Sequence, residues 1–298
     1  TDVILHLAKL KSKKNDLTEW EQFVHTIRTV KKSVNIAIVG KYFKTGDFTL
    51  ADSYISVIEA VKHGAWAHGA KAEITWINSE DYEKNSASVS NLDAFDGVIV
   101  PGGFGERGIE GIIKAIAYCR THGIPYLGLC YGMQLAVIEF ARSVCGIADA
   151  HTTEVNPKTA HPVIDTMPEQ IANIKEKRLG GSMRLGAYPC DLVLGTQSAA
   201  AYGTARISER HRHRYEFNNT FQTQLEKAGL IVAGINPERK LVEIIEIKKH
   251  PFFVGTQFHP ELKSRPLAPH PLFRAFAGAA LARGVRSKRG RNRRPTAQ

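Results

Sequence analysis

The sequence predicts an α/β fold in which a mostly parallel central sheet carries helices on both faces. From Val34 onward, short apolar runs alternate with segments of helical spacing, the order typical of a parallel sheet with helical crossovers. The second half is richer in strand-like runs, which predicts extra antiparallel strands. With 298 residues and 43% hydrophobic side chains, the chain can bury one substantial core.

Residues 34–283 contain both kinds of segment and form the predicted domain. Short apolar runs predict strands over residues 36–39, 73–77, 97–100, 125–129, 230–235, 241–247 and 252–258. Apolar residues at helical spacing predict helices over residues 53–67, 108–121, 133–144 and 271–283.

The two ends of the chain differ from this domain. Residues 1–33 are lysine-rich with an apolar stripe, which predicts a helix and a linker. The stripe consists of Leu17, Trp20, Phe23, Val24 and Ile27. Six of the charges behind the net charge of +11 lie in residues 286–294. Residues 284–298 are therefore expected to be a basic, flexible tail, with weak nucleic-acid or anionic-surface contact as the alternative.

The four cysteines show no CxxC motif and no paired spacing, so neither a zinc site nor a disulfide framework is predicted. Free thiols fit a reducing, cytoplasmic location. No uncharged apolar stretch of about 18 residues and no secretory leader is visible, so no membrane association is expected.

Residues 128–132, Gly-Leu-Cys-Tyr-Gly, have the form Gly-x-Cys-x-Gly, which is the sulfur version of the nucleophile elbow. The flanking glycines permit a sharp turn that holds the central side chain over a helix N-terminus. A predicted strand precedes the motif and a predicted helix follows it. Cys130 is therefore the candidate nucleophile.

His259-Pro260-Glu261 lies at the end of a predicted strand. Alternation along a strand would point His259 and Glu261 to the same side. Glu261 can then accept a hydrogen bond from one ring nitrogen while the other ring nitrogen faces a sulfur. Taken alone the tripeptide indicates a turn, but together with Cys130 it predicts a catalytic triad.

The glycine cluster at residues 101–105 follows the strand at 97–100, at the carboxyl end where open α/β sheets bind ligands. The plain interpretation is a tight turn. A dinucleotide site is not expected, because no ribose-binding acid follows about 20 residues later. The backbone N–H groups of Gly103 and Tyr131 are instead suited to an oxyanion hole.

These motifs resemble the class I glutamine amidotransferase family, and most closely the glutaminase domains of the CTP synthase family, over about residues 34–283. The resemblance implies a flavodoxin-like fold and the hydrolysis of L-glutamine. The elbow and His-Pro-Glu are common to the class. The match also includes residues 100–105 and 181–186. The narrower resemblance rests on Gly40-Lys41-Tyr42 with Asp52-Ser53-Tyr54, and on the Arg-His-Arg-His-Arg-Tyr run at 210–215.

The resemblance also implies a role for each matching residue. Cys130 would be the nucleophile, His259 the general acid and base, and Glu261 its orienting partner. Gly103 and Tyr131 would supply the oxyanion hole. The implied glutamine-binding residues are Gly103, Tyr131, Gly132, Met133, Gln134, Glu154 and Arg214, in which an anion faces the substrate ammonium and a guanidinium faces its carboxylate.

A larger enzyme is implied as well. Residues 1–33 resemble the linker to an amidoligase domain of the same polypeptide, in which ATP, UTP and Mg²⁺ would bind and ammonia would convert UTP to CTP. The glutaminase domain itself is expected to need no cofactor. GTP is implied as an allosteric activator, and the full-length enzyme is expected to be a homo-oligomer, a tetramer, without specific nucleic-acid binding.

Three features depart from the family pattern. Tyr131 replaces the usual leucine, extra residues lie between Gly46 and Leu50, and the stretch from Met167 to Arg178, which the family uses as a lid linked to GTP, is short.

Several alternatives stay open: the glutaminase of another amidotransferase, a γ-glutamyl or peptide hydrolase, or a non-catalytic regulatory relative. His211 and His213 form a candidate metal pair, disfavoured because the arginines between them would repel a cation.

Overall fold

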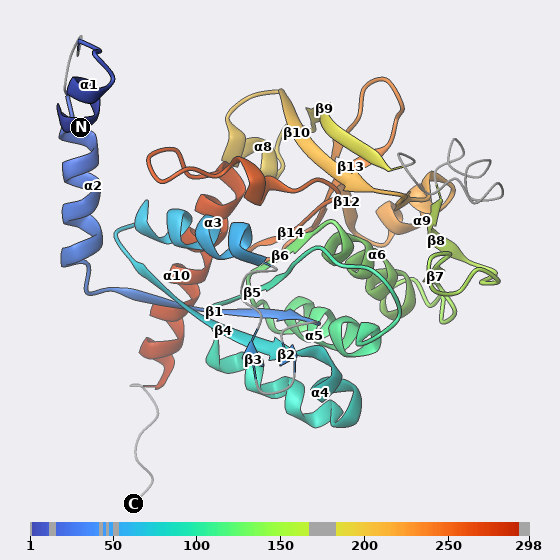
Figure 1. Ribbon diagram of the computed structural model, residues 1–298. Coiled ribbons are helices and arrows are strands. Elements are labelled where there is room, and N and C mark those ends of the chain that lie inside the picture. The colour runs from blue at the N-terminus through green and yellow to red at the C-terminus, as the bar shows by residue number, and fades with distance from the viewer. Residues whose placement is uncertain are drawn as a thin grey trace, which may run out of the picture.

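The computed structural model describes residues 2–11, 16–41, 44–45, 48–49, 54–166 and 183–291. A nine-stranded sheet forms the centre, in the order β10-β9-β12-β13-β14-β6-β5-β1-β4 (Figure 1). Its parallel half consists of β4 (Lys71–Asn78), β1 (Ser33–Gly40), β5 (Gly97–Val100), β6 (Tyr126–Leu129) and β14 (Phe253–Thr256). Its antiparallel half consists of β13 (Val242–Ile247), β12 (Leu230–Ile235), β9 (Arg184–Leu192) and β10 (Arg206–His213).

The predicted α/β fold is confirmed, and the antiparallel extension is as wide as four strands. Two small sheets accompany the large one. They consist of β11 (Tyr215–Phe217), β8 (Pro162–Thr166) and β7 (His151–Thr152), and of β2 (Lys44–Thr45) with β3 (Phe48–Thr49). The short helices of the structure are α4 (Ser79–Lys84), η2 (Ser86–Ala94), α8 (Gln197–Tyr202), η3 (Asn219–Phe221), α9 (Gln222–Lys227) and η4 (Pro260–Lys263).

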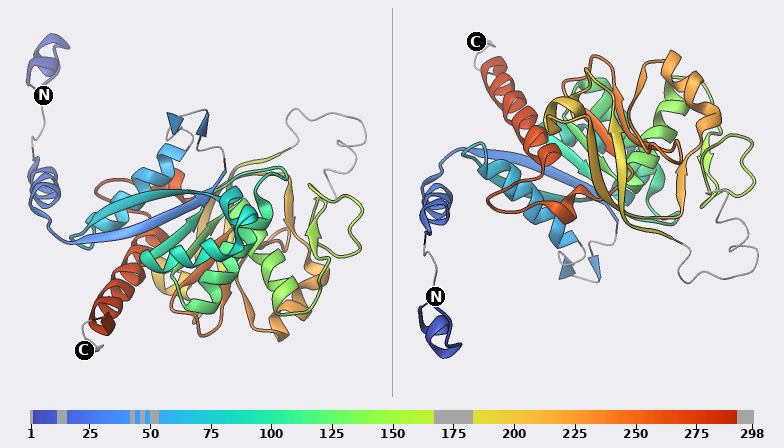
Figure 2. Two further views of the ribbon diagram at one scale, coloured as in Figure 1. Left: turned by 90° about the horizontal axis from the view of Figure 1, so that it is seen from below. Right: turned by 90° about the horizontal axis from the view of Figure 1, so that it is seen from above.

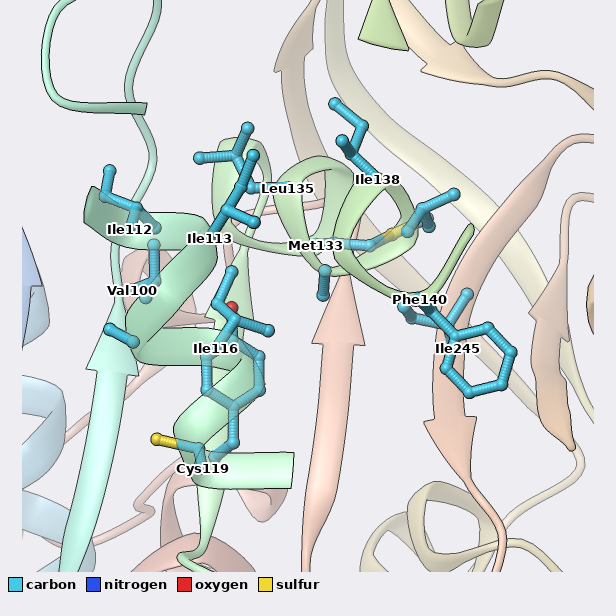
Figure 3. Close-up of a cluster of buried hydrophobic side chains, with 14 of the residues drawn as sticks. Val100, Ile112, Ile113, Ile116, Cys119, Met133, Leu135, Ile138, Phe140 and Ile245 are labelled. Atoms are coloured by element: carbon cyan, nitrogen blue, oxygen red, sulfur yellow. The ribbon is translucent and has the colours of Figure 1, made fainter. Parts of the chain in front are cut away.

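Helices cover both faces of the sheet because its strands are apolar on both sides. On one face α5 (Ile109–His122) and α6 (Tyr131–Ser143) pack against Val98, Val100 and Ile245, and Figure 3 shows this cluster. On the other face α3 (Ile55–Trp66) and α10 (Pro271–Arg291) cover Ile36 and Ile38. Each fully buried Ile or Val contributes about 1.5–3 kcal/mol to the free energy of unfolding. The two apolar layers therefore stabilise the sheet from both faces.

The N-terminal segment contains α1 (Asp2–Leu7) and α2 (Thr18–Thr29). In both views of Figure 2, α2 stands beside the body rather than within it. Its Phe23 ring contacts Trp66 at the end of α3, with ring centroids 5.5 Å apart, while Trp20 and Val24 stay exposed. The predicted apolar stripe therefore exists, and only part of it is covered within the described chain.

The C-terminal helix α10 continues to Arg291, past the expected end at Arg283, although Gly284 and Gly290 are poor helix formers. Residues 284–291, expected as the first part of a flexible tail, are therefore helical. Three features lie outside the described residues: most of the predicted insertion at 46–50, the short stretch at 167–178, and the tail beyond 291. Within the described ranges, no helix is long and apolar enough to cross a membrane.

A close contact between α3 and α10 gives a test of this packing. A Cβ atom on Gly64 would lie 2.5 Å from the Phe273 carbonyl oxygen, and backbone cannot move aside as a side chain can. We expect Gly64→Ala to lower the free energy of unfolding by about 1–3 kcal/mol, because this clash outweighs the gain in helix propensity.

Gly278→Ala in α10 is the matched control, since its new Cβ would meet only the His68 ring, at 3.1 Å. This variant should change the free energy of unfolding by less than about 1 kcal/mol. Urea unfolding of both variants measures the difference. Equal stability of Gly64→Ala and the parent chain would contradict the proposed close packing.

Candidate active site

Three neighbouring parallel strands deliver the candidate residues to one edge of the sheet. β5 leads into the glycine cluster, β6 leads into Cys130, and β14 leads into the segment that contains His259. Because parallel strands end on the same side, these segments meet where α/β sheets commonly bind ligands. A cavity of about 730 Å³ lies there, and Cys130, His259 and Glu261 all line it.

Cys130 occupies a strained elbow between β6 and α6. Its φ of 49° and ψ of −97° lie outside the regions that side-chain-bearing residues normally adopt. The flanking glycines are required by space: a Cβ on Gly132 would lie 2.3 Å from the Val100 carbonyl oxygen, and one on Gly128 would lie 2.7 Å from the Tyr126 hydroxyl. The Cys130 N–H donates to the Thr256 carbonyl oxygen at 2.6 Å, which ties the elbow to β14.

His259 and Glu261 form a hydrogen-bonded pair, with Nδ1 2.7 Å from Oε1. The expected strand geometry is wrong, because the backbone turns into η4 directly after His259, and this turn brings the two side chains together. The His259 N–H donates to the Arg210 carbonyl oxygen of β10 at 2.8 Å. Burial opposes the imidazolium, but the neighbouring Cys130 sulfur and the Glu261 carboxylate raise the pKa of His259 to about 11.

The remaining ring nitrogen of His259 is aimed into the site. Nε2 is buried and has no hydrogen-bond partner among the described residues. A Cβ atom on Gly102 would lie between the two candidate residues, 2.8 Å from the His259 ring and 3.8 Å from the Cys130 Cβ. Gly102 therefore leaves room for the imidazole to approach the cysteine.

Three groups hold the loop that contains Gly103 by its last residue, Gly105. The Gly105 N–H donates to Glu154 Oε1 at 2.9 Å, while its carbonyl oxygen accepts from Lys41 Nζ at 2.6 Å and from the Tyr131 hydroxyl at 2.7 Å. Burial lowers the pKa of Lys41 to about 8, against the attraction of Glu154. Burial likewise raises the pKa of Glu154, against the Gly105 N–H and Lys41.

The predicted glutamine-binding residues fall into two groups. Gly103, Gln134, Glu154 and Arg214 line the cavity. The side chains of Tyr131 and Met133 turn away from it: Tyr131 is bound to Gly105, and Met133 lies in the core cluster beneath α6 (Figure 3). Gly132 packs against β5 instead. Any contact of residues 131–133 with a ligand must therefore use their backbone.

Two residues near the reacting atoms were part of the recognised motifs but had no predicted role. Lys41 at the end of β1 reaches the glycine loop, and Gln257 donates from Nε2 to Cys130 Sγ at 3.7 Å. Both contacts join segments far apart in the chain. Only the position of Gln257 between a strand and His259 could have indicated its proximity to the site.

His211 and His213 lie on the buried side of β10, and His211 Nδ1 is 2.9 Å from His213 Nε2. Arg210 and Arg212 point to the opposite, exposed side, so they are not the charges that act on the pair. Burial and the nearby Arg184 lower the pKa of His211 to about 2, and burial and Arg184 lower that of His213 to about 3.

The positive groups that act on this pair are Arg184, which comes from β9, and His259. The Arg184 guanidinium lies 2.7 Å from Glu243. Over the described ranges, no group of three or more His, Cys, Asp or Glu side chains is arranged to hold a metal ion.

Comparison with known proteins identifies the family to which the chain belongs. Residues 49–279 match the family described as glutamine amidotransferase class-I. The chain belongs to this family. The CTP synthase of Chloroflexus aurantiacus is 53% identical over 279 residues, and that of Clostridium kluyveri is 54% identical over 280 residues. Each match covers 94% of this chain and 50% of the relative, so the chain spans about half the length of these relatives.

Solved structures show which members of the family are similar to this domain. The glutaminase domain of Trypanosoma brucei CTPS with bound acivicin is 36% identical, has a TM-score of 0.76, and is matched over 94% of its length and 84% of this chain. The chain thus belongs with the glutaminase domains of the CTP synthase family, and the predicted resemblance is confirmed. A putative GMP synthase protein from Thermoplasma acidophilum, at 16% identity and a TM-score of 0.53, shares the fold; the match covers 98% of that protein and 86% of this chain.

The buried histidines predict acid sensitivity of this domain. Their pKa values in the folded chain lie below the ordinary value of 6.5, so the folded chain resists protons that the unfolded chain binds. The stability that depends on neutral His211 and His213 is complete above pH 6.5 and is lost as the pH falls below it. Each histidine should lower the free energy of unfolding by up to about 1.4 kcal/mol per pH unit there.

Urea unfolding at a series of acidic pH values measures this slope. The glutamine side chain that replaces His213 would bind no proton in the unfolded chain. In His213→Gln the free energy of unfolding should therefore fall less steeply as the pH is lowered, by the contribution of one histidine. His122→Gln, at an exposed position on α5, is the control and should keep the parent slope. A His213→Gln slope equal to that of the parent chain would show that His213 does not resist protonation.

Proposed function

We propose that this domain hydrolyses L-glutamine to glutamate and ammonia, with Cys130 as the nucleophile. The observation that carries the proposal is the meeting of Cys130 and the bonded pair of His259 and Glu261 at the ends of adjacent strands, within one cavity. A strained elbow, a base and its orienting carboxylate are the parts that nucleophilic acyl transfer requires. Membership in the class I glutamine amidotransferase family supports the same reaction.

The proposed reaction has two halves. The Cys130 thiolate attacks the side-chain carboxamide carbon of glutamine, and the C–N bond breaks as His259 gives its proton to the departing ammonia. A γ-glutamyl thioester remains on the sulfur. Water then attacks the thioester while His259 takes up its proton, the C–S bond breaks, and glutamate and the original thiolate–imidazolium pair are restored.

The charge that develops on the substrate oxygen needs donors that are in place beforehand. We assign this role to the backbone N–H groups of Gly103 and Tyr131. The support comes from the contacts of Gly105, which hold the glycine loop and the start of α6 to each other through the Tyr131 hydroxyl. Donors fixed in this way need little reorganisation as the reaction proceeds.

Recognition of the amino-acid part is assigned to charged residues of the cavity wall. Glu154 would bind the glutamine ammonium and Arg214 its carboxylate, each through charge-assisted hydrogen bonds. Both line the same cavity as Cys130. Gln134 would add a polar contact from the first turn of α6, and the backbone of residues 131–133 would complete the site.

In the full-length protein we propose that the ammonia serves the ATP-dependent conversion of UTP to CTP in an amidoligase domain of the same polypeptide, with Mg²⁺. The CTP synthases that this chain resembles support this role, since the chain spans about half of their length. GTP activation, a homotetramer and a cytoplasmic location belong to the same proposal. The glutaminase domain itself is proposed to work without a cofactor.

The proposal is tested first at the nucleophile. Cys130→Ala should reduce glutamate release from glutamine by about a thousandfold or more, because no other group can form the thioester. Cys145→Ala, at a half-exposed cysteine outside the cavity lining, is the matched control and should keep the parent rate. Glutamate is measured enzymatically at saturating glutamine. Undiminished turnover by folded Cys130→Ala would reject the mechanism.

Recognition is tested separately at Arg214. Arg214→Ala should raise the KM for glutamine about tenfold or more, because the substrate carboxylate loses its guanidinium partner. Alkylation of Cys130 by iodoacetamide should stay close to the parent rate, since this reagent has no carboxylate. Arg206→Ala, on β10 and paired with Asp191 outside the cavity, is the control. An unchanged KM in Arg214→Ala would exclude the assigned contact.

A further inference from the structure

Gln257 brings a hydrogen-bond donor to the reacting sulfur. It follows β14 directly and is completely buried. Its backbone N–H donates to the Glu243 carbonyl oxygen of β13 at 2.8 Å, so the main chain still belongs to the sheet. Its side chain turns toward the elbow, where Nε2 donates to Cys130 Sγ at 3.7 Å.

The neighbouring Gln134 decides which end of the Gln257 amide faces the sulfur. Gln134 Nε2 donates to the Tyr215 carbonyl oxygen at 2.8 Å, and a carbonyl oxygen can only accept. The nitrogen end of Gln134 is therefore fixed at this point. The same nitrogen lies 3.3 Å from Gln257 Oε1, so the Gln257 oxygen faces Gln134 and its nitrogen is left to face Cys130.

The segment 256–259 thus holds the nucleophile at three points. The Thr256 carbonyl oxygen accepts from the Cys130 N–H, the Gln257 amide donates to Sγ, and the His259 imidazole, whose pKa is raised by the neighbouring sulfur, faces it. Only the first contact concerns the backbone. The other two act on the sulfur itself and favour its charged form.

We propose that Gln257 is a further catalytic residue, which stabilises the Cys130 thiolate through a side-chain N–H···S hydrogen bond, and that Gln134 is the positioning residue that orients it. The amide keeps its proton throughout, whereas His259 gives its proton to the leaving ammonia. Gln257 therefore still faces the sulfur when the thioester C–S bond breaks and the thiolate leaves. The inference rests on the proposed glutaminase reaction for its role in turnover, but not for its test.

The test follows the alkylation of Cys130 by iodoacetamide as a function of pH, read at the Cys130 peptide by mass spectrometry. Gln257→Met keeps the length of the side chain and removes the donor. We expect the pH midpoint of alkylation to rise by about one unit, and the rate at neutral pH to fall about tenfold. Glutamate release at neutral pH should fall in parallel, with a smaller change in KM than in kcat.

Gln134→Met is the second variant, because it leaves Gln257 in place and removes the group that orients it. Its pH midpoint should rise in the same direction by a smaller amount. The control is Gln197→Met, whose amide donates to the His250 carbonyl oxygen at 3.1 Å and touches no atom of Cys130. The control should reproduce the parent alkylation profile, and thermal unfolding checks that each variant is folded.

An unchanged alkylation profile in folded Gln257→Met would overturn the inference. If Gln257→Met does not fold, an unchanged profile in Gln134→Met overturns it instead. The proposed function fails separately: a parent chain that is alkylated at Cys130 but releases no glutamate would reject glutamine hydrolysis, while the comparison of pH midpoints would still decide the role of Gln257.

Discussion

The parallel pairing of β14 with β6 is the interaction on which the site depends. Leu129 and Thr256 are paired at the ends of these strands, so the residues that follow each strand lie side by side at the edge of the sheet. The Cys130 N–H then bonds to the Thr256 carbonyl oxygen. The elbow and the segment that contains His259 are more than 120 residues apart in the sequence. The pairing of their strands sets the distance between them through backbone contacts alone.

Much of the site could be predicted from the sequence because its chemistry is concentrated in short motifs. Gly-x-Cys-x-Gly and His-Pro-Glu carry their geometry locally, in a strained turn and in a hydrogen bond across two residues. The alternation of apolar segments likewise predicted the parallel half of the sheet. Even so, the reason for the His259–Glu261 contact was misjudged, since a 3-10 turn and not a strand brings them together.

The rest depends on contacts that no local pattern describes. Lys41 and Gly105 are 64 residues apart, and Gln257 and Cys130 are 127 apart. β10 was not predicted, because three of the four residues on its buried side, Glu209, His211 and His213, are polar. Its polar side chains are buried only because Arg184 and other polar groups surround them, and this is decided by tertiary packing.

The contact between the Tyr131 hydroxyl and the Gly105 carbonyl oxygen has a consequence for the precision of the site. Tyr131 starts α6 and Gly105 ends the glycine loop, so the bond joins two segments that are 26 residues apart in the sequence. Because a hydrogen bond restricts the separation of the atoms that it joins, the helix end cannot move away from the loop without losing this bond. The phenol of Tyr131 thus links the place of the glycine loop to the place of the helix that begins after Cys130.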